Sequence, residues 1–316
     1  MFTKTLTKYS KAVIEKNTTD YRKDAQELYD LLIKPLEAEL KAQKIDTLLF
    51  SMGTKLELFS FAALYDGKQF LVENYRLSLI PSFRLADTHY KELHNPQVLA
   101  MGISKFSDKP SLPTVPMEIS TITQLWQGKS FLNEKVTLEN IKVQRQKPFE
   151  IIHLATHAKF NEQIQEKYWI QLWDKKLIFD DLRQLKLYKY PKVKLLVLSA
   201  CETALGDKYA EMGFAGLAVK AGVNSAVASL WRVDDQATFA LMMQFYHHLK
   251  SSPIKAEALR QAQIALLKGE MNIESGKLIL GKDLKISLPT QLANLEDHDF
   301  SHPHYWAAFT MIGSPW

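Results

Sequence analysis

The spacing of apolar positions changes along the chain. From Asp20 to Leu40 apolar residues recur every three or four positions, which predicts an amphipathic helix that Pro35 should kink or split. From Ile45 to about Pro81 short apolar runs flank the turn dipeptide Asp66-Gly67, a pattern that predicts an antiparallel β-meander. The chain is therefore expected to begin with a helical segment, residues 1–44, and a small β-meander subdomain, residues 45–95.

Beyond residue 95 short apolar runs alternate with amphipathic stretches. Strands are predicted at 98–104, 151–155, 195–199 and 226–231, and helices at 117–127, 137–146, 214–221, 236–250 and 254–268. This alternation is typical of an α/β fold with a mostly parallel central sheet flanked by helices, here assigned to residues 96–316. The polar stretch 269–304 is expected to be a surface excursion, and the apolar stretch 306–312 closes the chain.

Composition narrows the class of protein. The 316 residues are 46% hydrophobic and 24% charged, ordinary globular values that exclude a disordered or fibrous chain. The net charge of +5 requires no nucleic-acid partner. A single cysteine excludes a disulfide framework and fits a reducing compartment. Neither a signal peptide nor an apolar run of about 18 residues is found, so we expect a cytoplasmic protein with no membrane partner.

Several common catalytic motifs are missing. The chain has no G-x-x-x-x-G-K-[ST] phosphate loop, no G-x-G-x-x-G after a strand, no H-E-x-x-H and no G-x-S-x-G. A nucleotide-binding loop, a dinucleotide site and a serine nucleophile elbow are therefore not expected. We predict no cofactor and no metal.

Candidate catalytic residues lie at the ends of two predicted strands. The segment EIIHLATHA places His157 at the end of one predicted strand, and LLVLSACETALG places Cys201 at the end of another. The carboxyl ends of parallel strands share one edge of a sheet, and a cysteine attacks as a thiolate formed with a nearby imidazole. From spacing alone, Cys201 could equally be a small buried apolar residue. His153 lies within its strand and is expected to be structural rather than to bind a metal with His157.

A longer series of motifs resembles the CHAT family, caspase-like domains found beside tetratricopeptide repeats, mostly in bacteria. The resemblance covers about Tyr21 to Trp316. Its motifs are HLATHA, LLVLSACETALGD, GFAGLAVKAGVNSAVASLWRVDDQAT, FYHHL, KAEALRQAQIAL and HPHYWAAFTMIGSPW. Cys201 follows His157 by 44 residues, close to the spacing of about 50 in caspases.

The resemblance implies a caspase-like fold and a cysteine endopeptidase that acts on protein or peptide substrates. In the family pattern His157 is the general base or acid and Cys201 is the nucleophile. The backbone N–H groups of Ala158 and Cys201 would form the oxyanion hole. A caspase-like scaffold or interaction module without proteolytic activity is the alternative function.

The sequence departs from the family pattern at two places. Relatives often have glycine where this chain has Ala158, and alanine would be strained there if the site needed a positive φ. Relatives also often carry an arginine and a proline where this chain reads LELFSF, residues 56–61. No repeat array fits within residues 1–19, so we expect either a separate regulatory partner, such as a tetratricopeptide-repeat protein, or that this chain is a fragment of a longer protein.

The segment Trp231-Arg-Val-Asp-Asp235 follows the next predicted strand. It resembles a Trp-x-Val-x-Asp stretch of separases, which implies that Asp235 receives an Arg or Lys side chain before the scissile bond, with Asp234 as second choice. Asp235 also fits the N-cap of a helix that starts at Gln236. Trp231 is expected either to wall this pocket or to fill the core.

Two further features are left open by the sequence. Glu202 is expected either to contact the substrate backbone or to stabilise the turn after Cys201. His298, His302 and His304 cluster near the C-terminus, where local packing is favoured over metal binding.

Overall fold

The computed structural model describes residues 2–16, 21–51, 59–80, 89–90, 93, 95–159, 169–189, 192–200, 216, 218–219, 221–252, 254–270, 272–280, 284–292 and 299–316. Cys201, Glu202, His298 and residues 56–58 of the LELFSF segment lie outside these ranges.

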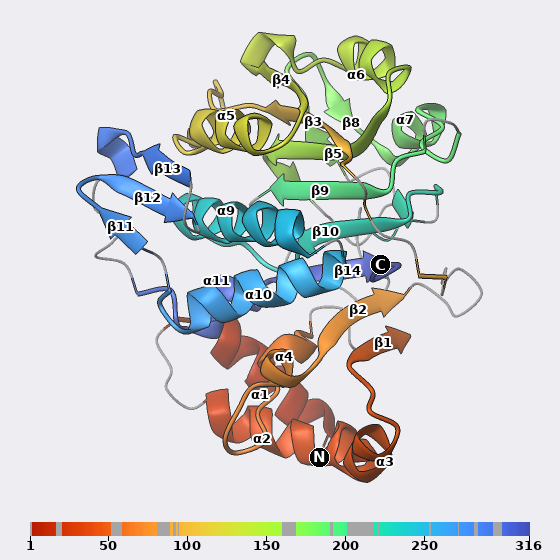
Figure 1. The fold of residues 1–316 in the computed structure, drawn as a ribbon, viewed down its shortest axis with the longest axis vertical. Helices are drawn as coiled ribbons and strands as arrows, with labels where there is room; N and C mark the ends of the chain where they lie inside the picture. Colours follow the sequence, from red (N-terminus) through yellow and green to blue (C-terminus); the bar gives the residue numbers. More distant parts are fainter. Residues whose placement is uncertain are drawn as a thin grey trace.

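An eight-stranded sheet forms the centre of the molecule (Figure 1). In sheet order its strands are β1 (Thr47–Ser51), β2 (Arg76–Ile80), β14 (Phe309–Gly313), β10 (Ser225–Ser229), β9 (Leu195–Ala200), β5 (Phe149–Thr156), β3 (Gln97–Gly102) and β4 (Gly128–Leu132). All neighbouring pairs are parallel except β10 and β14. The mostly parallel α/β sheet predicted from the sequence is thus confirmed.

Three helices pack side by side along one face of this sheet: α5 (Val115–Leu125), α9 (Asp235–Ser251) and α10 (Lys255–Leu267) (Figure 1). The middle helix, α9, is apolar on most of its circumference, and its residues 237–246 are all buried. A helix that is apolar all round must be covered on every side. Helices α5 and α10 contact α9, and the central sheet lies behind it (Figure 1). Helices α6 (Leu138–Arg145), α7 (Phe179–Gln184) and α11 (Pro303–Trp306) connect the strands.

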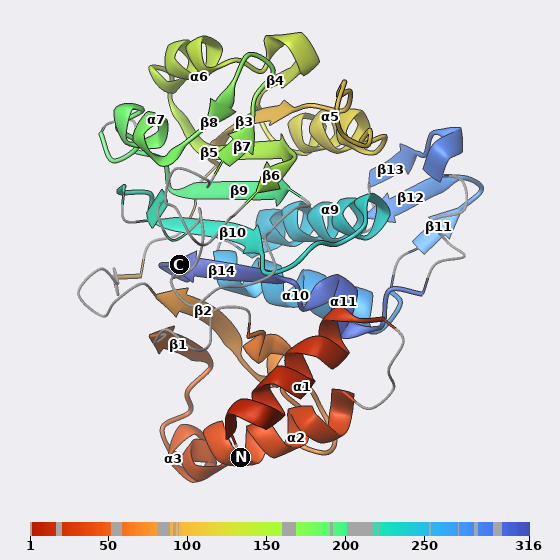
Figure 2. The same cartoon turned by 180° about the vertical axis from the view of Figure 1, so that it is seen from behind.

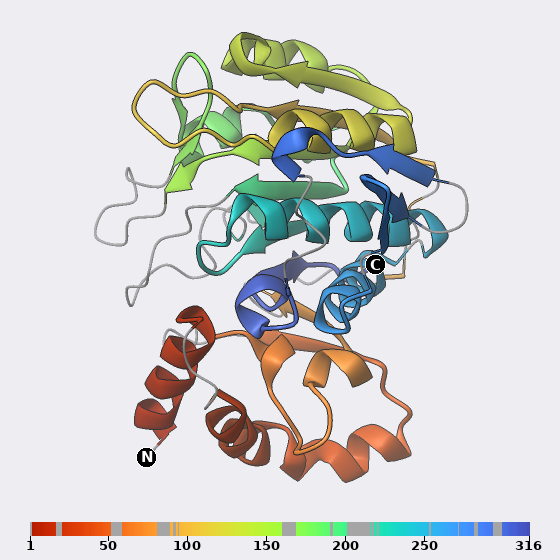
Figure 3. The same ribbon diagram turned by 90° about the vertical axis from the view of Figure 1, so that its left-hand side faces the viewer.

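The N-terminal helices gather at one end of the molecule (Figure 3). They are α1 (Phe2–Ile14), α2 (Tyr21–Leu32) and α3 (Glu37–Ala42), and α1 packs against α2. The predicted split at Pro35 is confirmed, because a 3-10 turn, Lys34–Leu36, separates α2 from α3. Proline lacks the N–H that would continue the α-helical ladder.

The antiparallel β-meander predicted for residues 45–81 is wrong. Asp66 does form a turn, its carboxylate accepting hydrogen bonds from the backbone of Lys68 and Gln69. The chain then enters a short helix, α4 (Leu71–Asn74), before β2 begins. Strands β1 and β2 pair in parallel, and β2 joins the central sheet through β14 near the C-terminus. The predicted subdomain boundaries at residues 44/45 and 95/96 stay predictions.

Two small antiparallel sheets flank the central one. One consists of β6 (Ala158–Lys159), β7 (Trp169–Gln171) and β8 (Lys176–Leu177), and it continues directly from the end of β5. The other consists of β11 (Asn272–Glu274), β12 (Lys277–Leu280) and β13 (Leu284–Ser287), within the stretch expected to be a surface excursion. It protrudes beyond α9 at the left of Figure 1.

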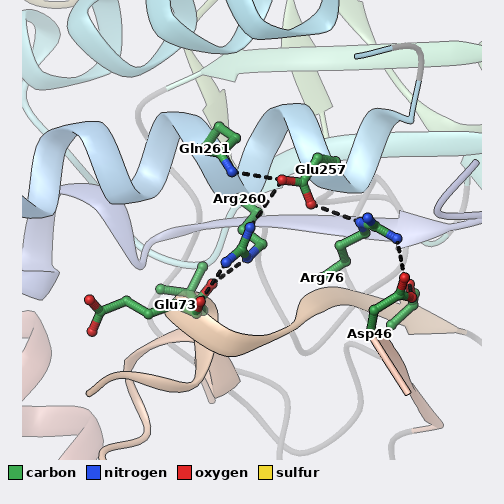
Figure 4. Close-up of polar contacts among 8 residues, drawn as sticks. Asp46, Glu73, Arg76, Glu257, Arg260 and Gln261 are labelled. Carbon is green, nitrogen blue, oxygen red and sulfur yellow. Dashed lines mark hydrogen bonds and ion pairs between the residues drawn. The ribbon is translucent and has the colours of Figure 1, made fainter. Parts of the chain in front are cut away.

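A polar network fastens the N-terminal part to α10 (Figure 4). The Arg76 guanidinium donates from Nε to Glu257, 2.7 Å away, and from Nη1 to Asp46, 2.8 Å away. Arg260 donates to the backbone carbonyls of Val72 and Glu73. Burial raises the pKa of Glu257, but hydrogen bonds from Gln261 and Arg76 and the nearby arginine charges bring it below its ordinary value. The network therefore stabilises the ionised carboxylate in place.

Candidate active site

His157 lies immediately beyond the end of β5. Thr156, the last residue of β5, is level with Ala200, the last residue of β9. The two candidate catalytic residues are thus the next residues in sequence after two paired positions, although Cys201 itself is outside the described ranges. Strands β6 and β7 lie beside this edge of the sheet (Figure 2).

Among the described residues, the imidazole of His157 has a hydrogen-bond partner at one of its two nitrogens. The ring is 2% exposed, and its Nε2 lies 2.8 Å from the backbone carbonyl oxygen of Pro110. Because a carbonyl oxygen only accepts, Nε2 carries the hydrogen and Nδ1 of the neutral ring keeps its lone pair. Within the described part of the chain, Nδ1 is buried and has no hydrogen-bond partner. The Phe106 ring, centred 4.5 Å from the imidazole, covers it further.

Ala158 occupies strand β6, opposite Ile170 of β7. It is fully buried and is not among the residues with positive φ. The backbone here therefore needs no glycine, and the departure from the family pattern at this position brings no strain. The turn is fixed by the Gln171 N–H, which donates to the His157 carbonyl oxygen at 2.8 Å.

His153, four residues earlier, sits in the interior of the sheet. It is fully buried, with Nε2 2.9 Å from Glu118 Oε1 and Nδ1 3.1 Å from the Tyr246 hydroxyl. Burial, and then the Glu118 charge, raise the pKa of Tyr246 well above its ordinary value, so this hydroxyl stays protonated. The expected structural role of His153 fits these contacts.

One short segment, residues 110–118, contacts three elements. The Pro110 carbonyl oxygen meets His157, as described above. The Thr114 N–H donates to Asp235 Oδ2 at 2.9 Å, and Glu118 meets His153. The segment spans the end of the loop after β3 and the first turn of α5.

Asp234 and Asp235 have different environments at the start of α9. Asp234 is the N-cap: its Oδ1 accepts from the Ala237 N–H at 2.8 Å, and its Oδ2 lies 3.4 Å from Lys16 Nζ. The alternative that Asp235 caps a helix starting at Gln236 is therefore wrong, because the helix begins at Asp235 itself. The cap position requires an extended backbone, which Asp234 has and a first helical residue does not.

Asp235 is a largely buried carboxylate without a neighbouring cation among the described residues. Burial raises its pKa to about 6, and the Glu118 and Asp234 charges act in the same direction, against the stabilising hydrogen bonds from Thr114. A buried carboxylate with a raised pKa gains from a cationic partner.

The remaining predicted residues take part in packing. Trp231 is 2% exposed and donates from Nε1 to the His304 carbonyl oxygen at 2.9 Å, which matches the core alternative rather than a pocket wall. His302 accepts from the His304 N–H, and His304 Nδ1 lies 2.7 Å from the Ile14 carbonyl oxygen. In the described part of the chain, no three His, Cys, Asp or Glu side chains converge as metal ligands. No helix described by the structure is both long and apolar enough to cross a membrane.

Sequence reasoning missed the groups that position His157 and Asp235. Pro110 acts through a carbonyl oxygen, Thr114 through an N–H, and Phe106 through ring packing. Backbone groups leave no residue-type signal in a sequence. The one usable clue is topological: these residues follow β3, which neighbours β5 and ends at the same edge of the sheet.

The sheet order and the strand-edge histidine define an α/β protein of the caspase-like class. The model of the CHAT domain family matches residues 22–314, and the chain belongs to that family. Among solved structures, the Arg-specific cysteine proteinase gingipain R superposes with a TM-score of 0.54 at 12% identity, covering 97% of this chain and 69% of that one. The Saccharomyces cerevisiae separase–securin complex superposes with a TM-score of 0.52 at 12% identity, and the match covers 98% of this chain and 20% of that one. These likenesses show the fold. A search of curated proteins finds no match.

Proposed function

We propose that this protein is a cysteine endopeptidase in which His157 and Cys201 form the catalytic dyad. The observation that carries the proposal is the state of His157: its Nε2 is tied to the Pro110 carbonyl oxygen while Nδ1 is buried and unpaired among the described groups. An imidazole fixed in this tautomer is prepared to accept a proton from a thiol. The strand that leads to Cys201 is the direct neighbour of the strand that leads to His157.

The proposed reaction has two stages. His157 Nδ1 takes the Cys201 thiol proton, the thiolate attacks the scissile carbonyl carbon, and the oxyanion accepts hydrogen bonds from the backbone N–H groups of Ala158 and Cys201. The imidazolium then gives its proton to the leaving amine as the C–N bond breaks. Water, deprotonated by the same imidazole, hydrolyses the thioester and restores the thiol.

Asp235 is the proposed receptor for an Arg or Lys side chain on the acyl side of the cut. Its carboxylate is largely buried, and its pKa is raised to about 6 by that burial. A guanidinium would supply the missing counter-charge. Asp234, by contrast, already lies against Lys16 and caps α9, so it is the weaker candidate.

The wider setting is proposed on the family resemblance. Proteins or peptides are the substrates, a regulatory protein such as a tetratricopeptide-repeat partner controls access, and the protein acts in the cytoplasm of a bacterium. Glu202, which follows the proposed nucleophile, is a candidate contact for the substrate backbone.

Covalent labelling tests the dyad directly. A peptide with a basic residue before an acyloxymethyl ketone should label the wild-type chain at Cys201, as read by intact mass and peptide mapping. Cys201→Ala should take no label, and His157→Ala should label at a rate lower by about a thousandfold. A matched control, His302→Ala, should label at the wild-type rate. Labelling that is insensitive to His157, or absent from wild type, would favour a scaffold without peptidase activity.

A further inference from the structure

A cavity of about 390 Å³ adjoins His157 on the side away from the cysteine strand. The residues after β3 and the end of β7 enclose it, chiefly Ile103, Lys105, Phe106, Gln171, Leu172 and Trp173. The proposed dyad uses neither this cavity nor Trp173.

The cavity shares two residues with the surroundings of His157. Phe106 lines it and also packs against the imidazole, with ring centres 4.5 Å apart. Gln171 lines it, and the Gln171 N–H donates to the His157 carbonyl oxygen at 2.8 Å. Phe106 and Gln171 therefore place the cavity next to His157.

The sheet order shows which part of a substrate would reach it. Strands β10, β9, β5 and β3 are consecutive parallel neighbours, so their carboxyl ends lie in a row. Asp235 follows β10, Cys201 follows β9, His157 follows β5, and the cavity residues 103–108 follow β3. In the proposed reaction the acyl part stays with the cysteine and the leaving amine receives its proton from the histidine. A substrate that runs along this row places its acyl side over β10 and its leaving side over β3.

The cavity has an apolar floor and a partly exposed aromatic wall. Ile103 and Leu172 are buried to 1% and 0% exposure, whereas Trp173 is 47% exposed. The Trp173 backbone is fixed by its N–H, which donates to the Val136 carbonyl oxygen at 2.9 Å. At the rim, Asp108 is already paired with Lys109 at 2.9 Å. An apolar group that enters would cover the open face of the indole, while the exposed Lys105 ammonium group stays in solvent.

We propose that this cavity binds the side chain of a large apolar residue, aromatic or aliphatic, on the leaving-group side of the scissile bond. Trp173 is the residue that determines this preference. The inference rests on the proposed peptidase function and adds a second specificity element to it.

Two kinds of substrate with the same acyl part test the inference. In one set an Arg-containing peptide continues beyond the cut with Phe, Leu, Gly or Asp. In the other, the same acyl peptide carries an aminocoumarin amide, which has no residue side chain beyond the bond. Wild type should cleave the Phe and Leu peptides with a kcat/KM about tenfold above the Gly and Asp peptides. Trp173→Ala should remove this preference while kcat/KM for the coumarin amide stays within twofold.

The control variants are matched for residue type and position. Tyr188 is 53% exposed, an aromatic residue that precedes β9 and so lies at the opposite edge of the sheet. Tyr188→Ala should keep the wild-type preference, and Trp173→Phe should keep most of it. Equal cleavage of all four peptides by wild type overturns the inference but leaves the peptidase function standing. A parallel loss on the coumarin amide in Trp173→Ala overturns it too, because that result shows a general structural effect. Absence of cleavage together with absence of Cys201 labelling overturns both proposals.

Discussion

Two histidines, one within β5 and one just beyond its end, show how differently the interior and the edge of the sheet use the same side chain. His153 has a polar side chain near each ring nitrogen, Glu118 at 2.9 Å and Tyr246 at 3.1 Å. His157 has one nitrogen at the Pro110 carbonyl oxygen and, among the described residues, the other without a partner. Both rings are almost fully buried. Burial therefore does not distinguish structural from chemical histidines here. Nε2 of His153 makes no hydrogen bond either, but it lies against the Glu118 carboxyl group, whereas Nδ1 of His157 has no polar partner among the described residues.

The largest effect is expected from the edge histidine. His157→Ala should lower kcat about a thousandfold, because it removes the proposed proton carrier. Its unfolding free energy should fall by only about 1 kcal/mol for the one lost hydrogen bond, apart from any packing loss. Peptide cleavage and thermal unfolding of the same preparation give both numbers. Wild-type kcat in this variant would remove the contrast with His153.

The interior histidine should show the reverse pattern. His153→Ala leaves the Glu118 carboxylate buried without its partner, which should cost about 3 kcal/mol or more of unfolding free energy. Urea unfolding measures this loss, and Tyr246→Phe, which removes one neutral partner, should cost about 1 kcal/mol. At a temperature where His153→Ala remains folded, kcat should stay within tenfold of wild type. A thousandfold fall at unchanged stability would exchange the two assignments.

The two aspartates at the start of α9 extend the comparison to carboxylates. Asp235→Asn should lower the preference for Arg over Gln before the cut by about 30-fold, because it removes the charge that pairs with the guanidinium. Asp234→Asn, which keeps an oxygen for the helix cap, should leave the preference unchanged. Cleavage of matched Arg and Gln peptides supplies the ratio. If Asp235→Asn keeps the wild-type Arg/Gln ratio, Asp235 does not bind the substrate side chain and serves only to accept the hydrogen bond from Thr114.

The same carboxylate should give a pH signature with a definite sign. Burial raises the pKa of Asp235 to about 6, from 3.8, so the folded chain holds this proton more tightly than the unfolded chain does. Its contribution to stability is therefore present at pH 4 and is lost as the pH rises towards 6. Over the same range the Arg/Gln preference should increase, because the carboxylate becomes charged. In Asp235→Asn the pH dependence of stability and the pH dependence of the Arg/Gln preference should both disappear over this range. If they persist, another titrating group causes them.

The smallest effect is expected far from the edge, in the network of Figure 4. Arg76→Ala removes hydrogen bonds to Glu257 and Asp46 and should cost about 1.5 kcal/mol of unfolding free energy. The charged side chains of this network pair with one another, as His153 does with Glu118, and none of them belongs to the proposed active site. The kcat and the peptide preference should therefore not change. A change in preference without loss of stability would show that this interface communicates with the sheet edge.

Local pattern predicted the parts of the fold that depend on local sequence. The runs at 151–155 and 195–199 became β5 and β9, and the parallel-sheet rule placed His157 at a strand end. The local pattern failed to predict the pairing of β1 and β2, because β2 pairs with β14, more than 200 residues away in the chain. A turn such as Asp66-Gly67 reverses the chain, but it does not determine which strand becomes the partner of the next one. The contacts of Pro110 and Thr114 could not be predicted from the sequence either, because they are made by backbone atoms.

The contacts of residues 110–118 recur at every fourth position: Pro110 meets His157, Thr114 meets Asp235, and Glu118 meets His153. The segment thus contacts the proposed proton carrier, the proposed substrate receptor and the sheet interior, and its length sets the spacing between these three contacts. Side chains between these positions can be exchanged without changing its length. A single residue inserted or deleted between two of these positions would displace at least one contact relative to the other two. The site therefore depends on the length of this segment as well as on the Glu118 side chain.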